Sequence, residues 1–219
     1  MGSVNEYFDK IYCINLDRRP DRWEENCLPQ FKKLGLEVER FSATDGQSEL
    51  DLPHGKTYNA ELAGCYSHLN AIKKAKEEGV KRLLLLEDDV VFVDDLNEKF
   101  SSLINNVPPN WDILFFGGNH IGGVRPINNG VVRLNKSYAI HACGISENVY
   151  DIMILHLEKN IKKVLDNRDT RFTPSVAVDY FLAELHRSLG VYCFKPHLAW
   201  QLDGYSDIQH SNVNYKFLK

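Results

Sequence analysis

Uninterrupted hydrophobic runs recur along this chain and predict strands that are covered on both faces. The clearest run is residues 83–86, which are four consecutive leucines. Runs without polar alternation are typical of central strands in a parallel sheet. Further strands are expected at residues 11–14, 111–116 and 191–194, and a pair of strands at residues 130–134 and 138–145. Residues 37–41 alternate between polar and apolar and predict a half-exposed strand.

Apolar residues at helical spacing predict helices between these strands. Their expected ranges are residues 20–34, 60–78, 94–106, 147–165 and 176–189. Pro29 should kink or split the first helix, and Ser146 should cap the fourth, in which Ile152 and Leu155 are expected to face inward. Strands that alternate with helices predict an α/β fold, with a mixed, mostly parallel sheet and helices on both faces. A length of 219 residues favours a single domain, residues 1–219.

The composition is that of an ordinary folded protein. Hydrophobic residues make up 43% of the chain, and the formal net charge is −4. This charge gives no basic surface for nucleic acid, which is therefore not an expected partner. No apolar run approaches the roughly 20 residues of a transmembrane helix, and the N-terminus lacks a signal-peptide core. We therefore expect no transmembrane segment and a cytoplasmic location, with peripheral contact to a membrane left open.

The cysteines agree with that location. There are five, at positions 13, 27, 65, 143 and 193, without a C-x-x-C pair. We expect them to be reduced and mostly buried. Because neither thiols nor histidines cluster along the sequence, a zinc site is not expected.

Three carboxylates, Glu87, Asp88 and Asp89, follow the leucine run directly. At the carboxyl end of a central strand they would lie at the sheet edge where α/β proteins bind ligands. Since side chains alternate along a strand, Glu87 and Asp89 should point to one side and Asp88 to the other. Two carboxylates on one side favour a divalent cation, because hard cations prefer oxygen ligands.

The local motif leaves other interpretations open. A solvated strand end would also carry acids, although a simple turn is more cheaply made with Gly, Asn or Pro than with crowded like charges. Phosphatases with an aspartyl nucleophile and two-metal nucleases also place an acid-x-acid motif after a strand. Val90 and Val91, which follow the acids, weaken the phosphatase alternative.

Three arginines gather where the first strand should lead into the first helix. Arg18, Arg19 and Arg22 flank Pro20, which suits a first helical turn. A guanidinium matches phosphate oxygens, and a helix N-terminus adds free N–H groups. Surface ion pairs with neighbouring acids such as Asp21 would explain the arginines equally well.

Four further positions carry weaker signals. Gly64 lies inside a predicted helix, where glycine costs about 1 kcal/mol against alanine, so a ligand or a neighbouring helix should approach there. His68, one turn later, is by itself more typical of a buried structural histidine. Gly117 follows a predicted strand and permits either close ligand approach or a turn. Asp179 lies near a helix start, where its charge favours the helix dipole.

Taken together, the motifs resemble glycosyltransferase family 25, which includes lipopolysaccharide galactosyltransferases and collagen hydroxylysine galactosyltransferases. The resemblance extends over nearly the whole chain. It is carried by Ile14-Asn15-Leu16-Asp17-Arg18-Arg19-x-Asp21-Arg22, Glu61-Leu62-x-Gly64-Cys65-x-Ser67-His68, Leu86-Glu87-Asp88-Asp89, Trp111-Asp112-Ile113, His141-Ala142, Asp179 and Ser206-Asp207-Ile208.

The resemblance implies a GT-A-type, Rossmann-like fold and the inverting transfer of a hexose from a UDP-sugar, usually with Mn²⁺ (or Mg²⁺). The hexose would be galactose, glucose or N-acetylglucosamine, and the acceptor a hydroxyl of a glycan or of hydroxylysine in a collagen-like chain. Nucleotide-sugar contacts would come from Asn15, Leu16, Arg18, Arg22, Gly64, Ser67, His68, Glu87, Asp88, Gly117, Ser206 and Asp207.

The resemblance also implies roles in catalysis. Asp89 would bind the metal, with Glu87 as a second ligand or a ribose contact, and His197 is the first choice for a histidine ligand, before His210. Asp179 resembles the base that accepts the acceptor's proton. If it is not, the base should be sought among Asp112, Asp203 and Asp207.

A protein that binds a UDP-sugar or serves as a scaffold without turnover is the alternative. It predicts bound UDP, no sugar transfer and no base. A carboxylate at the position of Asp179 argues against it.

Overall fold

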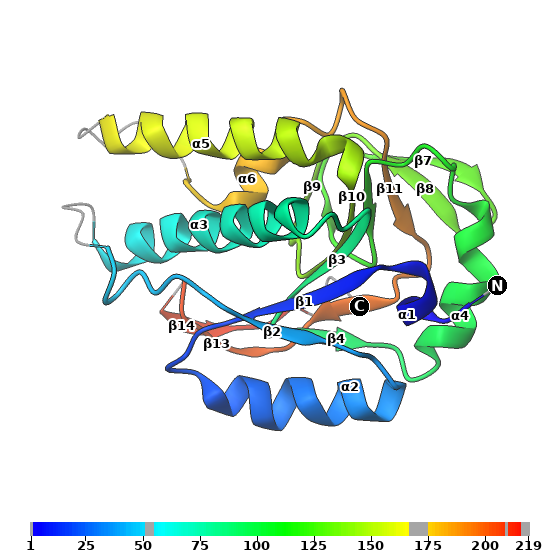
Figure 1. Cartoon of the computed structure of the whole chain (residues 1–219), viewed down its shortest axis with the longest axis horizontal. Coiled ribbons are helices and arrows are strands. Elements are labelled where there is room, and N and C mark those ends of the chain that lie inside the picture. The colour runs from blue at the N-terminus through cyan, green and yellow to red at the C-terminus, as the bar shows by residue number, and fades with distance from the viewer. Residues whose placement is uncertain (1, 51–54, 167–174, 209, 216–219) are drawn as a thin grey trace.

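An eight-stranded sheet forms the centre of the computed structural model, which describes residues 2–50, 55–166, 175–208 and 210–215 (Figure 1). The strand order is β2-β1-β3-β10-β5-β11-β8-β7. In chain order these strands are β1 (Lys10–Asn15), β2 (Glu39–Ser42), β3 (Arg82–Glu87), β5 (Ile113–Phe115), β7 (Val124–Asn128), β8 (Val131–Leu134), β10 (Ala142–Ser146) and β11 (Val191–Phe194).

The sheet is mixed but mostly runs in one direction. Strands β2, β1 and β3 are mutually parallel, as are β5 and β11. Strand β10 lies antiparallel between β3 and β5, and β8 lies antiparallel between β11 and β7. In this sheet only β10 and β8 therefore oppose the common direction, which agrees with the predicted fold class.

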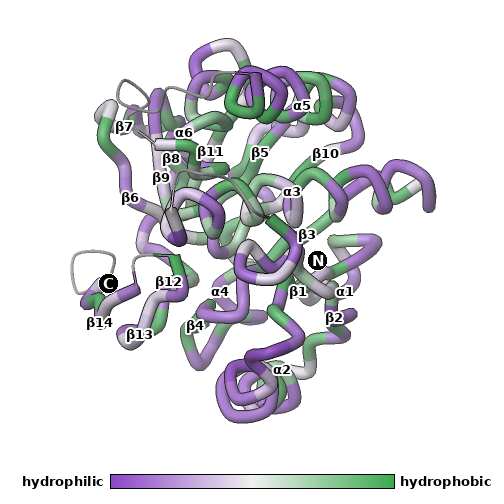
Figure 2. The backbone as a smooth tube through the Cα atoms, turned by 90° about the vertical axis from the view of Figure 1, so that its left-hand side faces the viewer, coloured by the Kyte–Doolittle hydropathy of each residue, from purple (hydrophilic) through white to green (hydrophobic). Residues whose placement is uncertain are grey.

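Helices cover both faces of the sheet (Figures 1 and 2). On one side lie α3 (Lys56–Glu77), α5 (Tyr150–Asp166) and α6 (Val178–Ala183). On the other lie α1 (Val4–Tyr7), α2 (Leu28–Leu34) and α4 (Leu96–Leu103). Single helical turns or short irregular helices are η1 (Arg22–Cys27), η2 (Ile104–Asn106) and η3 (Glu147–Val149). Two-stranded ribbons join β4 (Val90–Phe92) to β12 (Ala199–Gln201), β6 (Asn119–His120) to β9 (Ser137–Tyr138), and β13 (Gly204–Ser206) to β14 (Ser211–Val213).

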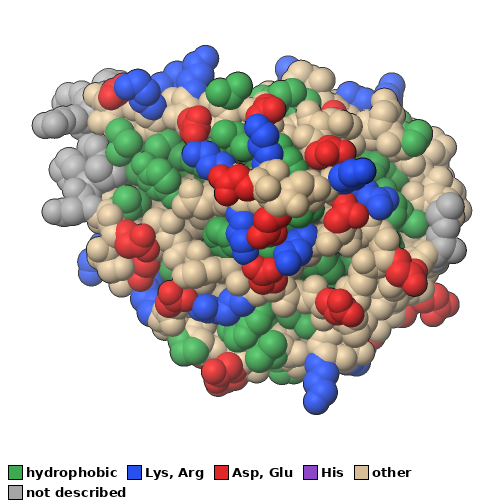
Figure 3. Space-filling model, in the orientation of Figure 1, with side chains coloured by type: hydrophobic (Ala, Val, Ile, Leu, Met, Phe, Trp, Pro, Cys, Tyr) green, Lys and Arg blue, Asp and Glu red, His purple; other side chains and the backbone are tan. Residues whose placement is uncertain are grey.

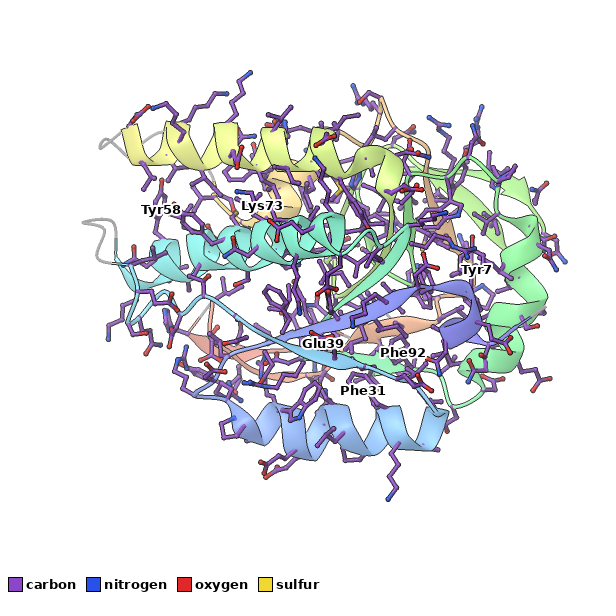
Figure 4. The ribbon with its side chains drawn as sticks, viewed as in Figure 1. Tyr7, Phe31, Glu39, Tyr58, Lys73 and Phe92 are labelled. Carbon is purple, nitrogen blue, oxygen red and sulfur yellow. The ribbon has the colours of Figure 1, made fainter. Side chains whose placement is uncertain are left out.

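The leucine run explains why the core has two layers. Leu83 and Leu85 pack on the side of α3 and α5, whereas Leu84 and Leu86 pack on the side of α2 and α4. Each strand residue thus contributes to one layer or the other, as expected for a strand buried on both faces. Phe31 of α2 and Phe92 of β4 lie in the layer between α2 and the sheet (Figure 4).

The sheet edge at β2 is covered by charges of both signs. Glu39 of β2 pairs with Lys10 of β1 and with Lys74 of α3, and Lys74 also reaches Glu78 at 3.6 Å. Acidic and basic side chains gather in the middle of this face (Figure 3), and Glu39 lies there (Figure 4). Charges on an edge strand discourage the pairing of a further strand.

Local sequence signals placed the first and fourth helices well. The first runs without a break from residue 20 to residue 34, so Pro29 does not split it: the winding changes from the π-helix η1 to α2 at Leu28, and Pro29 lies in the first turn of α2. Gly35 ends α2 with φ +66°, a left-handed conformation that glycine adopts without strain. The Ser146 hydroxyl accepts a hydrogen bond from Asn148 N–H at the start of η3 and α5, as predicted for a cap.

Three expectations about the elements were wrong. Residues 130–134 and 138–145 do not pair with each other, because β5 and β11 separate β10 from β8 in the sheet. The last helix ends at Ala183, not at residue 189. Ile152 and Leu155 of α5 are exposed, since Met153, Leu157 and others form its buried stripe.

Candidate functional site

A cleft of about 450 Å³ opens at the carboxyl ends of the parallel strands β2, β1 and β3. Thr44 follows β2, Leu16 follows β1 and Glu87 ends β3, and all three line the cleft. The remaining lining comes from the first half of α3, from residues 138–140 and 177–179, and from the C-terminal segment around β13 and β14. Parallel strand ends thus meet at one ligand-sized cleft, as the sequence predicted.

The three acids of the motif have different surroundings. Asp88 is 7% exposed and accepts hydrogen bonds from Asn15 Nδ2 and Arg22 Nη1, both at 2.7 Å. Neither Glu87 nor Asp89 has a lysine or arginine within 4.0 Å among the described residues. Asp88 is therefore neutralised by the protein itself, whereas Glu87 and Asp89 are not.

Burial and mutual repulsion raise the pKa values of the other two acids. For Glu87 burial is the main cause, followed by the charges of Asp89, Asp179 and Asp88, and the pKa lies well above its usual range. For Asp89 burial and the charge of Asp88 raise the pKa to about 6. The cost of holding two such carboxylates together is relieved by a cation.

The residues present fit a divalent cation at Glu87 and Asp89. Asp89 Oδ2 accepts a hydrogen bond from Gln201 Nε2 at 3.3 Å, but Asp89 Oδ1 is buried without a hydrogen-bond partner among the described residues. Among the described residues, Glu87 and Asp89 belong to no group of three histidines, cysteines or acids whose ligand atoms all lie within 4.8 Å of one another. Mn²⁺ and Mg²⁺ commonly complete their shells with substrate phosphates and water, so two carboxylates suffice.

Gly64 and His68 lie one helical turn apart on α3 and both line the cleft. The ring Nδ1 of His68 is 3.0 Å from Gly64 O, which can only accept, so Nδ1 carries the proton and Nε2 faces Glu87 Oε1 at 3.4 Å. Burial lowers the pKa of His68 to about 4, so the ring is neutral at pH 7. A side chain at Gly64 would meet no atom within 4 Å, so this glycine keeps the cleft open and no helix packs against it there.

Asp179 lies in the cleft at the start of α6. Its Oδ2 accepts a hydrogen bond from Ala139 N–H at 3.1 Å. Ala139 has φ +63°, an uncommon conformation for a residue other than glycine. The carboxylate therefore stabilises a strained bend in the cleft wall, and its charge also raises the pKa of Glu87.

The arginines attach the C-terminal segment to the first strand end. Arg22 Nη2 donates to Tyr205 O at 2.6 Å, and Arg18 bridges Asp45 at 2.8 Å and Asp207 at 2.7 Å. Arg19 pairs with Asp207 as well as with Asp21. Burial alone would raise the pKa of Asp207, but the ion pairs with Arg18 and Arg19 hold this pKa below its usual range. The predicted ion pair with a neighbouring acid is present between Arg19 and Asp21. Phosphate binding stays a prediction, for which Arg18 and Arg22 are in position because they line the cleft.

Most of the predicted site residues line this one cleft. They are Leu16, Arg18, Arg22, Gly64, Ser67, His68, Glu87, Asp88, Asp89, Asp179, Ser206 and Asp207. Asn15 lies just behind the cleft at 1% exposure, where it orients Asp88. Ser67 is 2% exposed and its hydroxyl accepts a hydrogen bond from Thr44 N–H at 3.0 Å, which fixes the loop after β2.

The structure does not bring Gly117, His197 or His210 into the cleft lining. A side chain at Gly117 would lie 2.0 Å from Ala199 O, so the close approach at this glycine is to β12. His197 Nε2 lies 3.1 Å from His120 Nε2. His210 belongs to the turn before β14.

The structure also shows the surroundings of the other three acids that were considered as the base. Asp112 Oδ2 accepts a hydrogen bond from Gly190 N–H at 2.7 Å and Asp203 Oδ1 accepts one from Tyr215 N–H at 2.6 Å, both outside the cleft lining. Asp207 lines the cleft but is held by two arginines. Of the four candidate acids, Asp179 is the one in the cleft without an arginine among its described partners.

Sequence reasoning missed several residues of the cleft. Asn119, Tyr138, Gln201 and Tyr215 line it but follow no motif. Burial and then the charges of Asp89 and Glu87 raise the pKa of Tyr215 to about 12. Their positions depend on how distant segments fold together, and of the four only Tyr138 lies in a predicted element, the strand at residues 138–145.

Comparison with known proteins agrees with this geometry. The profile of the family described as "Glycosyltransferase family 25 (LPS biosynthesis protein)" matches residues 8–137, more than half of the chain. "Procollagen lysyl hydroxylase and glycosyltransferase" of Acanthamoeba polyphaga mimivirus is 32% identical over 160 residues, which cover 59% of this chain and 17% of that protein. Human "Procollagen galactosyltransferase 2" is 28% identical over 131 residues, which cover 50% of this chain and 21% of that protein.

A solved structure supports the fold. The crystal structure of a glycosyltransferase involved in the glycosylation of the major capsid of PBCV-1 superposes with a TM-score of 0.50 at 14% identity, covering 92% of this chain and 95% of that one. The fold is thus of the GT-A type that the motifs implied. None of the helices within the described ranges is long and apolar enough to cross a membrane.

The chain spans about a fifth of the length of these curated relatives. The matched segment contains the first strand end, the cleft-lining half of α3 and the three acids after β3. On the family profile and this geometry, the chain belongs to glycosyltransferase family 25.

Proposed function

We propose that this chain transfers a hexose from a UDP-sugar to a hydroxyl group with inversion at the anomeric carbon. One observation carries the proposal most: a single cleft combines arginines, two carboxylates without a cationic partner and a third carboxylate on another wall. Arginines suit a diphosphate, the paired carboxylates suit a cation, and the third suits a base. The family membership agrees with this assignment.

The nucleotide would bind at the ends of β1 and β2. Leu16 gives an apolar surface there, and Arg18 and Arg22 supply positive charge toward the diphosphate. The open space at Gly64 leaves room for the ligand next to the acids. Asn15 and Asp88 hold Arg22 in place from behind.

Glu87 and Asp89 would hold Mn²⁺ or Mg²⁺. Such an ion, when bound, offsets the negative charge that develops on the departing UDP. Buried Asp89 Oδ1, which has no partner among the described residues, is the atom that favours this assignment. His68, neutral and fixed by Gly64 O, limits how Glu87 can turn.

Asp179 would act as the base. Its Oδ2 is held by Ala139 N–H, so its other oxygen is left to accept the proton of the acceptor hydroxyl. The acceptor oxygen would form its bond to the anomeric carbon as the bond to the UDP oxygen breaks on the opposite side, which inverts the centre. The electron pair leaves with UDP, and the proton ends on Asp179.

For the acceptor we propose a hydroxyl of a glycan or of hydroxylysine in a collagen-like chain. The names of the two curated relatives include procollagen, and the family description includes lipopolysaccharide biosynthesis. Galactose, glucose and N-acetylglucosamine are the candidate sugars. Incubation with collagen-like peptides and with lipooligosaccharide separates the two acceptor classes.

The test of the donor is a thermal-shift screen of UDP-sugars with and without Mn²⁺, followed by a transfer assay with the sugars that bind. We expect at least one UDP-sugar to raise the melting temperature more with Mn²⁺ than without it. Binding without release of UDP in the presence of any acceptor would instead favour the non-catalytic alternative. No shift with any UDP-sugar would contradict both.

We expect Arg22→Ala to weaken UDP binding by about 10- to 100-fold, the range of one hydrogen bond to a charged group. Arg22 lines the cleft and its removal also leaves Asp88, at 7% exposure, without its cation. The matched control is Arg19→Ala, because Arg19 is not a lining residue and Asp207 keeps its bond to Arg18. Titration calorimetry with UDP measures both, and equal losses would mean that only general surface charge matters.

The pKa of Asp89 predicts how cation binding depends on pH. Its folded pKa of about 6 lies above that of an unfolded aspartate, about 3.9, so the metal-free protein loses stability as the pH rises from about 4 to about 6, and the full cost of ionising Asp89 remains above pH 6. A cation competes with this proton, so the gain in melting temperature from Mn²⁺ should be small at pH 5 and near its maximum above pH 7. Thermal-shift titrations at several pH values measure it, and a gain that does not change with pH would place the cation elsewhere.

A further inference from the structure

A second group of metal-binding side chains lies outside the acid pair. His120, Cys193 and His197 each offer one ligand atom, and these three atoms lie within 4.8 Å of one another. The two imidazole Nε2 atoms are 3.1 Å apart. Two nitrogens bound tetrahedrally to one Zn²⁺ at about 2.0–2.1 Å lie a little over 3 Å apart, so this spacing matches a shared zinc ion.

Ser137 prepares His120 for such a role. Its hydroxyl is fully buried, 2.9 Å from His120 Nδ1 and 3.2 Å from the carbonyl oxygens of Asn119 and Tyr138. Because carbonyls only accept, the hydroxyl donates to one of them and accepts from His120 Nδ1–H. That tautomer leaves the lone pair of His120 on Nε2, toward His197. Zinc-binding histidines usually have such a partner on the other ring nitrogen.

We propose that His120, Cys193 and His197 bind one Zn²⁺ ion, separate from the cation of the acid pair. One thiolate and two imidazoles suit zinc, whereas Mn²⁺ and Mg²⁺ prefer oxygen ligands. On binding, the S–H bond of Cys193 breaks, an S–Zn bond forms and the proton goes to solvent. The fourth ligand is water, since His120 and His197 are only partly buried.

Without the metal, Cys193 and His120 are already held by contacts within the chain. The Cys193 thiol donates to Phe194 O at 3.2 Å, and burial raises its pKa. Burial, followed by His197 as the largest charge effect, lowers the pKa of His120 to about 4. The ring of His120 is therefore available as a neutral ligand at pH 7, and zinc is what makes a buried thiol lose its proton.

The position of the three ligands indicates which parts of the fold a zinc ion would connect. His120 lies on β6, Cys193 on β11, and His197 in the segment between β11 and β12. Strand β6 pairs with β9, and Asn119 and Tyr138 of this ribbon line the cleft. A zinc ion would tie the ribbon to the central sheet and so fix the cleft wall that carries the strained bend at Ala139.

The test is the metal content of the purified chain, measured by inductively coupled plasma mass spectrometry after zinc loading and removal of excess. We expect about one zinc ion per chain in the native sequence and a loss of this zinc in His120→Ala and Cys193→Ser. Cys143→Ser is the matched control, because Cys143 and Cys193 are both buried and flank Phe115 from neighbouring strands. Asp89→Asn should also retain zinc, because Asp89 belongs to the other site.

Two further measurements keep the test decisive if a ligand variant fails to fold. Ser137→Ala preserves all three ligands and should weaken zinc binding by about 10- to 100-fold. Cobalt in place of zinc should give a thiolate-to-metal absorption band that is retained in Cys143→Ser. A native chain that binds no zinc, or a zinc content unchanged by His120→Ala, Cys193→Ser and Ser137→Ala alike, would overturn the proposal.

Discussion

Replacing Asp89 with asparagine is expected to abolish the Mn²⁺-dependent part of UDP-sugar binding. The substitution removes the carboxylate whose Oδ1 is buried without a partner among the described residues, while an amide oxygen can still accept from Gln201. Neutralising developing charge on a leaving group is worth several kcal/mol, so transfer should fall by about 10³-fold or more. Thermal shifts with UDP-sugar, with and without Mn²⁺, and the rate of UDP release measure the two effects.

Without metal, the same variant is expected to make the protein more stable than the native chain. Burial and the charge of Asp88 raise the pKa of Asp89 to about 6, so its ionised form is destabilising at pH 7.5. The substitution Asp89→Asn should therefore increase the free energy of unfolding by about 1–3 kcal/mol without metal, since a shift of about two pKa units corresponds at most to about 3 kcal/mol. Asp94→Asn is the control, because Asp94 is exposed and pairs only with Lys33 among the described residues. A variant at position 89 that is less stable without metal, or that keeps its response to Mn²⁺, contradicts the assignment.

Hydrophobic runs predicted the buried strands of the central sheet because such strands need consecutive apolar residues, whereas the mostly exposed edge strand β7 was missed. The run 83–86 became β3, and its alternate leucines serve the two layers of the core. Pairing was predicted poorly, since register and strand order depend on contacts far along the chain. Strand β10 inserts between β3 and β5, and no local signal near residue 142 indicates those partners.

The half of the site close to the first strands was also predictable. Glu87, Asp89 and Arg22 follow strand ends, and parallel strand ends converge at one edge. Ribbon β6–β9 and the C-terminal hairpin reach the cleft only through tertiary folding, so Asn119 and Tyr215 carried no signal. His197 was expected beside the acids, but the turn after β11 holds it against His120. Cys193 and His197 are four residues apart, but His120 joins them only through tertiary folding.

The substitution Asp179→Asn is expected to separate binding from turnover. An asparagine oxygen can still accept the hydrogen bond from Ala139 N–H, so the bend at φ +63° and the fold should persist. UDP-sugar and Mn²⁺ affinities should change little compared with turnover, because in the proposed mechanism Asp179 contacts the acceptor hydroxyl and neither the diphosphate nor the cation. What the amide cannot do is accept a proton.

Transfer by this variant should fall by about 10²- to 10⁴-fold, the usual contribution of a positioned base. Donor affinity and the rate of sugar transfer must be measured on the same preparation, with Asp112→Asn as a control that lies outside the cleft lining and changes a comparable hydrogen bond to a backbone N–H. Turnover near the native rate would reduce Asp179 to a residue that supports Ala139 and the start of α6. A loss of Mn²⁺ binding would instead place it beside Glu87 and Asp89 as a ligand. Asp207 is the other candidate acid in the cleft, and it is held by Arg18 and Arg19. To act as the base it would first have to break two ion pairs, so Asp179 is the stronger assignment.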